Sequence, residues 1–232
     1  MARSKPSRFL KFLAFAGVSL AILCMASQPV NAVNLKFGRK PLDPSVQNAL
    51  TDMKLTPQHL YQWQAEKPKS LLLQIHGWSP EKQETAAALA LYIRSQNRNV
   101  SAKDTWREAV AFVHYSEKFK LPVDMAVAVA QVESRFNPNA VSSEGAMGPM
   151  QVLWRVHSHL LRNHLNLVTK KDLLDPEKGV AAGCLLLSRY MKAHQTEKRA
   201  LARYLGAPSR TYWNAFSRYL DRFRKHLTVA RS

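Results

Sequence analysis

The segment from Val123 to Val132 is nearly continuous alanine, valine and methionine, interrupted by Asp124 near its start and Gln131 near its end. Its larger apolar residues recur at helical spacing, and its alanines let neighbouring elements pack closely. A helix that is apolar on every side must be surrounded by other elements. The segment therefore predicts a central core helix, over 123–134, around which the rest of the chain is packed.

The remaining sequence predicts a protein that is almost wholly helical. Glycine is scarce, with 8 residues in 232, and no stretch alternates β-branched with polar residues. Capping side chains stand directly before prolines in Thr56-Pro57, Ser79-Pro80 and Asp175-Pro176, an arrangement typical of a helix start. We expect an all-α fold with helices over 44–53, 57–66, 80–96, 103–119, 123–134, 150–164, 176–194, 198–205 and 211–226.

Residues 1–32 have the three parts of an export signal. Positive residues come first, an uncharged apolar run follows over 12–26, and Val30-Asn31-Ala32 offers small residues to a signal peptidase. The apolar run is shorter than the roughly 18 residues that a membrane-spanning helix needs. We expect cleavage of this signal and an exported protein, in the periplasm or cell envelope.

A polar, non-periodic stretch around 97–102 divides the rest of the chain into two regions. Residues 33–100 are expected to be helical and hold no motif with a known role. Residues 101–232 hold all the residues with a chemical signature. The sequence leaves open whether the first region is a separate domain or an extension packed on the second.

The chain carries a net charge of +18, and without the four positive charges of the signal the balance is still +14. Such a charge predicts attraction to a polyanion. Export disfavours nucleic acid and leaves anionic cell-wall polymers and membrane surfaces. The basic residues concentrate near the C-terminus, where a solvated helix face and a binding surface both remain open. Cys184 is the only cysteine after the signal, so no internal disulfide is expected.

Glu133 stands at the last turn of the predicted core helix, before Asn137-Pro138 forces the chain out of helix. Loss of hydration and the negative end of the helix dipole both oppose the charge of this carboxylate and raise its pKa. A general acid for cleavage of a glycosidic bond needs that property. The alternatives are neutralisation by an arginine such as Arg135, or a side chain that points into solvent.

A turn-rich loop follows over 141–151. Gly145 and Gly148 would let backbone approach a ligand closely. Gln151 offers a donor and an acceptor to a polar substrate.

Together these segments resemble the soluble-lytic-transglycosylase-like (SLT) family of the lysozyme superfamily. The resemblance spans about 105–215 and rests on ESRFNPNAVS at 133–142, GAMGPMQ at 145–151, DPEKGVAAG at 175–183 and ALARY at 200–204. The order and spacing of these blocks are those of the family. The resemblance implies an all-α, lysozyme-like domain at 101–232 with an N-terminal helical extension.

The resemblance also implies a reaction and a set of site residues. Glu133 would protonate the glycosidic oxygen between N-acetylmuramic acid and N-acetylglucosamine in peptidoglycan. It would then take the proton of the muramyl 6-hydroxyl, which closes a 1,6-anhydro ring without a metal or cofactor. Ser134, Ser142, Gln151 and Tyr204 would line the cleft and hold the glycan; the alternative for each is a local cap or a buried hydrogen bond.

Two departures from the family pattern put the shape of the glycan cleft in question. Leu205 replaces the asparagine after the family's tyrosine, and Leu153 stands where many members have methionine. A metal site is not predicted either, because no carboxylate or cysteine completes a ligand set with the histidines at 157, 159 and 164.

Three alternative functions remain open at this point. The first is a hydrolytic muramidase on the same fold, in which water completes the reaction. No second carboxylate is convincing among Glu144, Asp172 and Asp175, and a lone carboxylate suffices where the substrate assists. The second is a non-catalytic peptidoglycan-binding envelope protein. The third is a cationic membrane-surface protein that works through its basic C-terminal stretch. Envelope or secretion-machinery proteins are possible partners besides the glycan strands.

Overall fold

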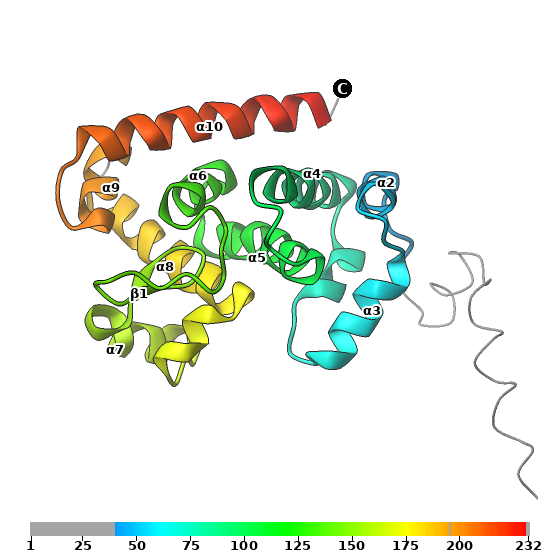
Figure 1. The fold of residues 1–232 in the computed structure, drawn as a ribbon, viewed down its shortest axis with the longest axis horizontal. Coiled ribbons are helices and arrows are strands. Elements are labelled where there is room, and N and C mark those ends of the chain that lie inside the picture. The colour runs from blue at the N-terminus through cyan, green and yellow to red at the C-terminus, as the bar shows by residue number, and fades with distance from the viewer. Residues whose placement is uncertain (1–39, 195, 231–232) are drawn as a thin grey trace, which may run out of the picture. The chain divides into compact units, whose positions relative to one another are not determined.

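A computed structural model describes residues 40–194 and 196–230; the predicted signal over 1–32 lies outside them. The predicted all-α fold is confirmed (Figure 1). The elements are α2 (Pro44–Asp52), α3 (Pro57–Glu66), η1 (Leu72–Gly77), α4 (Pro80–Gln96), α5 (Ala102–Phe119), α6 (Val123–Glu133), β1 (Ala146–Met147), β2 (Val152–Leu153), α7 (Trp154–Leu165), η2 (Lys170–Leu174), α8 (Pro176–His194), α9 (Glu197–Leu205) and α10 (Arg210–Ala230). Over the described ranges, no helix combines the length and apolar character that crossing a bilayer requires.

Prolines and capping side chains start the helices where the sequence predicts. Pro57, Pro80 and Pro176 each occupy the first turn of a helix. There the missing proline N–H costs no hydrogen bond, because the helix would leave that N–H unpaired anyway. At α5 the Ser101 side chain accepts a hydrogen bond of 3.0 Å from the backbone N–H of Asp104, as the capping pattern predicts.

Helix α6 is the centre of the core. Every residue from Met125 to Gln131 is buried, and α6 packs against α5, α8 and α10. One hydrophobic cluster joins α2, represented by Val46 and Leu50, to α6 and to Phe223 in α10. The helices before residue 97 therefore share their core with the helices that follow.

Helix α10 lies across α6 and α4 (Figure 1). Its buried side chains, Phe216, Leu220 and Phe223, fall at helical spacing on one face. The ring of Phe223 lies 4.9 Å from that of Tyr92 in α4. One face of α10 thus closes the core, which leaves the opposite face to solvent.

A buried ionic cluster fastens α8 to α5 and to the chain before η1. The Arg107 guanidinium, 4% exposed, donates to Asp175 at 2.7 Å and to Glu177 at 2.9 Å. Glu177 also accepts from the backbone N–H of Leu71 at 3.1 Å and from the hydroxyl of Ser70. Asp175 and Glu177 share the single Arg107 cation, so neither carboxylate is left without an ion-pair partner.

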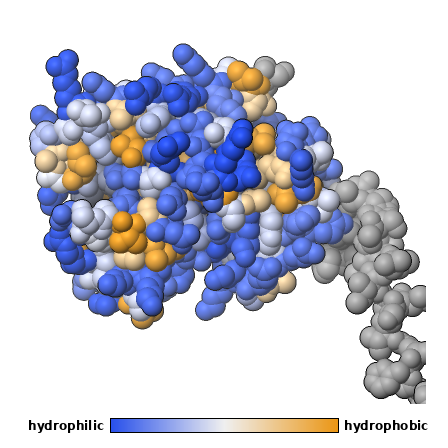
Figure 2. All heavy atoms as spheres, in the orientation of Figure 1, coloured by the Kyte–Doolittle hydropathy of each residue, from blue (hydrophilic) through white to orange (hydrophobic). Residues whose placement is uncertain are grey.

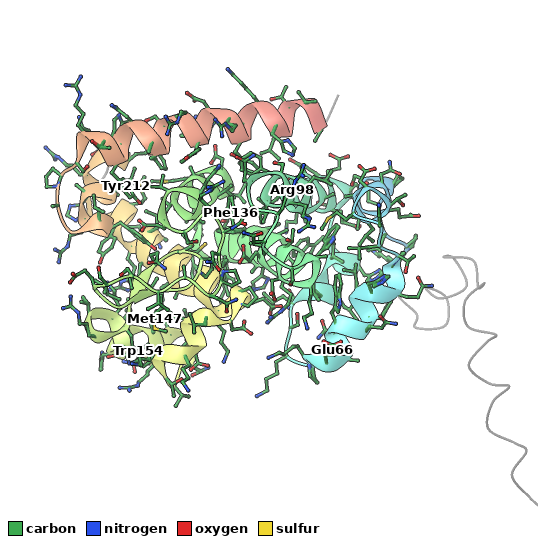
Figure 3. The ribbon with its side chains drawn as sticks, viewed as in Figure 1. Glu66, Arg98, Phe136, Met147, Trp154 and Tyr212 are labelled. Carbon is green, nitrogen blue, oxygen red and sulfur yellow. The ribbon has the colours of Figure 1, made fainter. Side chains whose placement is uncertain are left out.

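The predicted helix over 150–164 is wrong at its start, because α7 begins at Trp154. Residues before it form a turn, with positive φ at Gly148 (80°) and Gln151 (49°). The turn brings β2 back antiparallel to β1, pairing Met147 with Val152. The chain cannot be helical through two positive-φ positions, since right-handed helices need negative φ. Met147 and Trp154 belong to a second, smaller hydrophobic cluster around this turn (Figure 3).

Candidate functional site

Glu133 is the last residue of α6, and the chain reverses direction directly after it. Arg135 and Phe136 both have positive φ, of 54° and 63°. The backbone N–H of Phe136 bonds back to the carbonyl of Ala130 at 3.4 Å. Two successive non-glycine residues in this conformation are strained and persist only where packing holds them.

The side chain of Phe136 provides that packing. It is fully buried and lies edge-on to Tyr92 and Phe112, with ring centroids 6.2 Å and 6.3 Å away (Figure 3). Edge-to-face contacts at these distances are favourable. The Glu133 backbone is therefore fixed by α6 on one side and by a buried aromatic anchor on the other.

The carboxyl group of Glu133 has unusual proton chemistry for a glutamate. Burial raises its pKa to about 7, against a smaller lowering by a hydrogen bond from Tyr212. Near neutral pH the group is thus present in both protonation states. A carboxyl with a pKa near the working pH can donate a proton in one step and accept one in the next.

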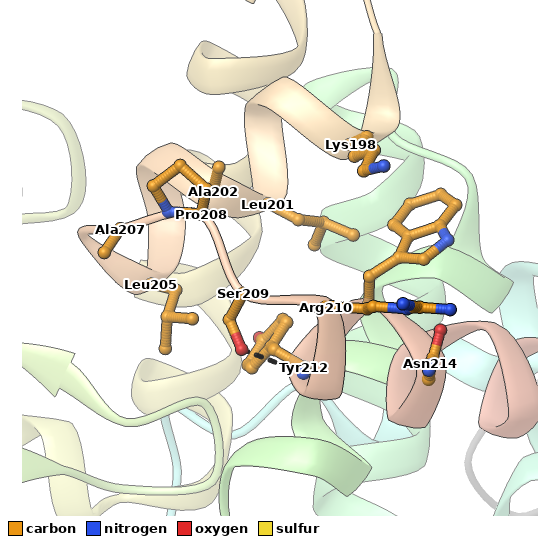
Figure 4. A pocket seen from close by; sticks show the side chains of 11 residues that line it. Lys198, Leu201, Ala202, Leu205, Ala207, Pro208, Ser209, Arg210, Tyr212 and Asn214 are labelled. Atoms are coloured by element: carbon orange, nitrogen blue, oxygen red, sulfur yellow. Dashed lines mark hydrogen bonds between the residues drawn. The ribbon is translucent and has the colours of Figure 1, made fainter.

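Tyr212, in the first turn of α10, is the hydrogen-bond partner of Glu133. Its phenol oxygen donates to Oε1 of Glu133 at 2.6 Å. Burial and the Glu133 charge both raise the pKa of Tyr212 far above its usual value, so the phenol stays a donor. The backbone N–H of Tyr212 is in turn held by the Ser209 hydroxyl at 3.1 Å (Figure 4).

Tyr212 was not among the site residues predicted from the sequence. One signal places it on the buried face of its helix, because Tyr212 precedes Phe216 by four residues. The contact with Glu133 follows only from the way α10 packs on α6. Arg135, the alternative partner that would neutralise Glu133, has another contact: its side chain donates to the carbonyl of Gln96 at 3.1 Å.

Three of the predicted binding residues meet at the carbonyls of the loop after α6. The Ser134 hydroxyl donates to Pro149 at 2.7 Å, and the Tyr204 phenol donates to Met150 at 2.7 Å. The Gln151 amide donates to Gly148 at 3.0 Å and to Ala140 at 3.2 Å. These bonds fix the loop beside Glu133.

Ser142 lies apart from these three, nearer the tip of the loop, where its hydroxyl accepts from the backbone N–H of Ala146 at 3.1 Å. The bond closes a local turn. Tyr204 is close enough to Glu133 for the carboxylate charge to contribute to its raised pKa, after the larger effect of burial.

The loop rests directly on the backbone around α8. A Cβ on Gly148 would lie 2.0 Å from the carbonyl oxygen of Leu173, and one on Gly183 would lie 2.3 Å from the sulfur of Met150. The sequence predicted that backbone at Gly145 and Gly148 would approach a ligand closely. At Gly148 the close neighbour is the protein's own backbone at Leu173. Nothing lies within 4 Å of a Cβ on Gly145.

The other carboxylates that were weighed as partners of Glu133 have separate structural contacts. Asp172 accepts from the backbone of Val168 and Thr169 and pairs with Lys178, which lowers its pKa to about 2. Asp175 pairs with Arg107. Over the described residues no group of three or more histidine, cysteine, aspartate or glutamate side chains is arranged to hold a metal.

A cavity of about 360 Å³ opens between α9 and α10. Tyr212 lines it on the side toward Glu133, and Trp213, Lys198 and Arg210 contribute an indole and two cations (Figure 4). Leu205, the residue that departs from the family pattern, is 42% exposed and lines the same cavity. The departure therefore falls on a wall of this cavity and does not touch the Glu133–Tyr212 bond.

Comparison with known proteins identifies the part of the chain that holds this site. Residues 111–219 match the family described as the Transglycosylase SLT domain. No curated protein sequence matches the chain. Among solved structures, the 70 kDa soluble lytic transglycosylase SLT70 from Escherichia coli is similar, at 19% identity and a TM-score of 0.42. That likeness covers 86% of this chain and 38% of the other, so this chain spans well under half of that protein's length.

The matched segment begins in α5, contains α6 with Glu133, and ends in α10 beyond Tyr212. It agrees with the extent of the resemblance seen in the sequence. Residues 111–219 of the chain therefore match the transglycosylase SLT domain.

Proposed function

We propose that this protein is a peptidoglycan lytic transglycosylase with Glu133 as its catalytic acid and base. The observation that carries the proposal is a glutamate whose pKa burial raises to about 7, at the end of the core helix of an SLT domain. Such a carboxyl fits a reaction that needs an acid first and a base afterwards.

In the first step the protonated Glu133 donates its proton to the oxygen of the β-1,4 bond between N-acetylmuramic acid and N-acetylglucosamine. The bond from that oxygen to C1 of the muramyl sugar breaks, and the 2-acetamido group stabilises the cationic C1. In the second step the Glu133 carboxylate takes the proton of the muramyl 6-hydroxyl, and O6 bonds to C1. The product is a 1,6-anhydro sugar, and no water is consumed.

Tyr212 supports this chemistry as a positioning residue. Its phenol donates to Oε1 of Glu133, so the proton for the substrate resides on Oε2. The same bond stabilises the carboxylate left after that proton has moved, because hydrogen bonds to charged groups are stronger than those to neutral ones.

The predicted binding residues enter the proposal with a shared role. Ser134, Gln151 and Tyr204 bond the loop after α6, and Ser142 closes its turn. We propose that they shape the glycan cleft through this loop and contact the sugars with their remaining hydrogen-bonding capacity. The proposal also includes export, with residues 1–32 as a cleaved signal, and residues 33–100 as a helical support of the domain at 101–232.

The test is mass spectrometry of the fragments that the purified protein releases from peptidoglycan, beside the Glu133→Gln variant. Anhydro-muropeptides from the wild type and none from the variant are expected. Reducing-end products would assign a hydrolytic muramidase instead. If neither the wild type nor the variant releases fragments and both still bind peptidoglycan, the protein is a non-catalytic peptidoglycan-binding envelope protein.

A further inference from the structure

A second hollow continues from the cavity beside Tyr212 along the exposed face of α10. Its volume is about 660 Å³. Trp213 and Asn214 line both hollows, so the two adjoin at these residues, and we treat them together as one path. The path runs from the α9–α10 connection to Lys225, the last of its lining residues. From Arg210 to Lys225 the helix extends about 22 Å at the usual rise per residue.

Five cations line this path, and we call them the cationic track: Lys198, Arg210, Arg218, Arg222 and Lys225. Across the described parts of the chain none of the five pairs with a carboxylate. Asp221 is the only acidic residue that lines either hollow. The track therefore carries five positive charges against the single negative charge of Asp221.

Two of the guanidinium groups are held in place on the helix surface. Arg218 and Arg222 lie over the ring of Tyr219, at 5.2 Å and 5.5 Å from its centroid. Cation–π contacts of this kind orient a guanidinium on the helix surface. Arg222 also donates to Oε1 of Gln96 at 3.3 Å. By contrast, Arg224, on the flank of α10, is paired with Asp124 at 2.6 Å.

The chemistry of α10 favours an anionic polymer over a membrane. A helix that binds a bilayer surface places its apolar face in the lipid, but the apolar residues Phe216, Leu220 and Phe223 are buried in the core. The surface along α10 is mostly hydrophilic in Figure 2. Trp213, at the junction of the two hollows, offers an aromatic face to a sugar or peptide.

We infer that the cationic track binds the carboxylate-bearing peptide stems of peptidoglycan, along the strand that Glu133 cuts. The inference rests on the proposed function for the identity of the polymer. One end of the track is the cavity lined by Tyr212, the hydrogen-bond partner of Glu133, and its cations are complementary to a row of carboxylates. The track binds the substrate away from the bond that is cut, and the strength of this binding depends on the peptide stems.

The test measures binding in full-length chains that carry Glu133→Gln, so that cleavage plays no part. One variant adds Arg210→Gln, Arg218→Gln and Lys225→Gln, which leave the Arg222 and Arg224 contacts intact. The matched control adds Lys67→Gln, Lys69→Gln and Lys171→Gln, three exposed lysines away from α10. Each chain is sedimented at low salt with intact peptidoglycan, with glycan stripped of its peptide stems by an amidase, and with anionic phospholipid vesicles.

On intact peptidoglycan the track variant is expected to bind about tenfold more weakly than the control, because each exposed ion pair contributes modestly. Stripped glycan keeps one lactyl carboxylate on each muramyl sugar but has lost the carboxylates of the stems, so the difference between the two chains should be clearly smaller there. Equal binding of both chains to intact peptidoglycan would overturn the inference, as would an equal deficit on stripped glycan. A deficit confined to the vesicles would assign the track to lipid headgroups. A failure of cleavage in the wild-type assay would contradict the proposed function and leave this binding result unaffected.

Discussion

The phenol of Tyr212 donates a 2.6 Å hydrogen bond to Oε1 of Glu133 across 79 residues of sequence. The bond makes the proton chemistry of the last residue of α6 depend on how α10 is docked. Helix α10 is docked in part by α4, through the contact of Phe223 with Tyr92 and a 2.8 Å bond between His226 and the Ala88 carbonyl. The helices before the SLT domain thus help to place a donor in its candidate site.

Removal of the phenol hydroxyl should change both the rate and the pH profile. Free protein with a protonated Glu133 is the active form in the proposed reaction, so kcat/KM should fall above about pH 7. In Tyr212→Phe the hydrogen bond that lowers the pKa of Glu133 is absent, so the falling limb should move to higher pH. Loss of a bond to a developing carboxylate should also lower kcat at pH 6 by about tenfold or more.

Release of soluble muropeptides, measured between pH 5 and 9, checks both effects. Tyr219→Phe is the control, because Tyr219 lies on the same helix and its ring, which the change retains, makes the contacts with Arg218 and Arg222. If kcat/KM of Tyr212→Phe fell over the same pH range as that of the wild type, the positioning role of Tyr212 would be contradicted.

Glu133 should cost the fold stability at neutral and alkaline pH. Its folded pKa of about 7 lies above the value near 4.3 expected in an unfolded chain. The folded state therefore binds the proton more tightly, and stability is lost as pH rises from about 4 through 7. Glu133→Gln removes this dependence while it keeps an acceptor for Tyr212. Urea unfolding should show the variant about 2–3 kcal/mol more stable at pH 8 and nearly equal at pH 4.

A second buried carboxyl, that of Glu108, should also lower the stability of the fold as pH rises, although it has no role in the proposed reaction. Glu108 in α5 is fully buried, and neither oxygen has a hydrogen-bond partner in the part of the chain that the structure describes. Burial raises the pKa of Glu108 well above its ordinary value, with a further contribution from Asp104 and an opposing one from Arg107. The group is therefore neutral in the folded protein near pH 5.

Stability from this group is present below the unfolded pKa and declines as pH rises toward the folded pKa. Glu108→Gln should raise the free energy of unfolding at pH 9 by at least about 1 kcal/mol, with a smaller effect at pH 5. The exposed loop residue Glu144 supplies the control as Glu144→Gln, which makes the same chemical change outside the core. If Glu108→Gln were less stable than the wild type at pH 9, the ionised Glu108 carboxylate would have to be stabilised by its surroundings.

Helix starts were predictable from sequence because their signals are local. Pro57, Pro80 and Pro176 fix the backbone of the first turn by themselves, and the structure begins helices at each of them. The start of α7 was mispredicted because the turn before it uses positive φ at Gln151, a residue type that gives no such signal. Two strands of two residues each are also too short for an alternating pattern to appear.

In the candidate site, too, features set by local sequence were predictable and features set by tertiary packing were not. The place of Glu133 at the end of an apolar helix and its raised pKa follow from the local sequence, and the structure has both. The partner Tyr212 depends on tertiary packing between α6 and α10, which no local pattern encodes. The same holds for the path along α10, because it needs the α9–α10 connection and the exposed helix face in one place.

Two glycines in the loop after α6 offer a matched pair for testing how that loop is seated. Gly145 and Gly148 have nearly the same φ, 79° and 80°. Alanine at either position should cost about 1 kcal/mol, because side chains rarely adopt that conformation. Only at Gly148 would the new Cβ also meet another atom, the carbonyl oxygen of Leu173 at 2.0 Å.

Gly148→Ala should therefore destabilise the protein by roughly 1–3 kcal/mol more than Gly145→Ala, as measured by chemical unfolding. Displacement of the loop would also disturb the carbonyls to which Ser134 and Tyr204 donate, so muropeptide release should fall further in Gly148→Ala than in Gly145→Ala. If the two variants were equally stable and equally active, the loop could move off α8 without cost. The contact of Gly148 with the η2 backbone at Leu173 would then have no part in holding the site.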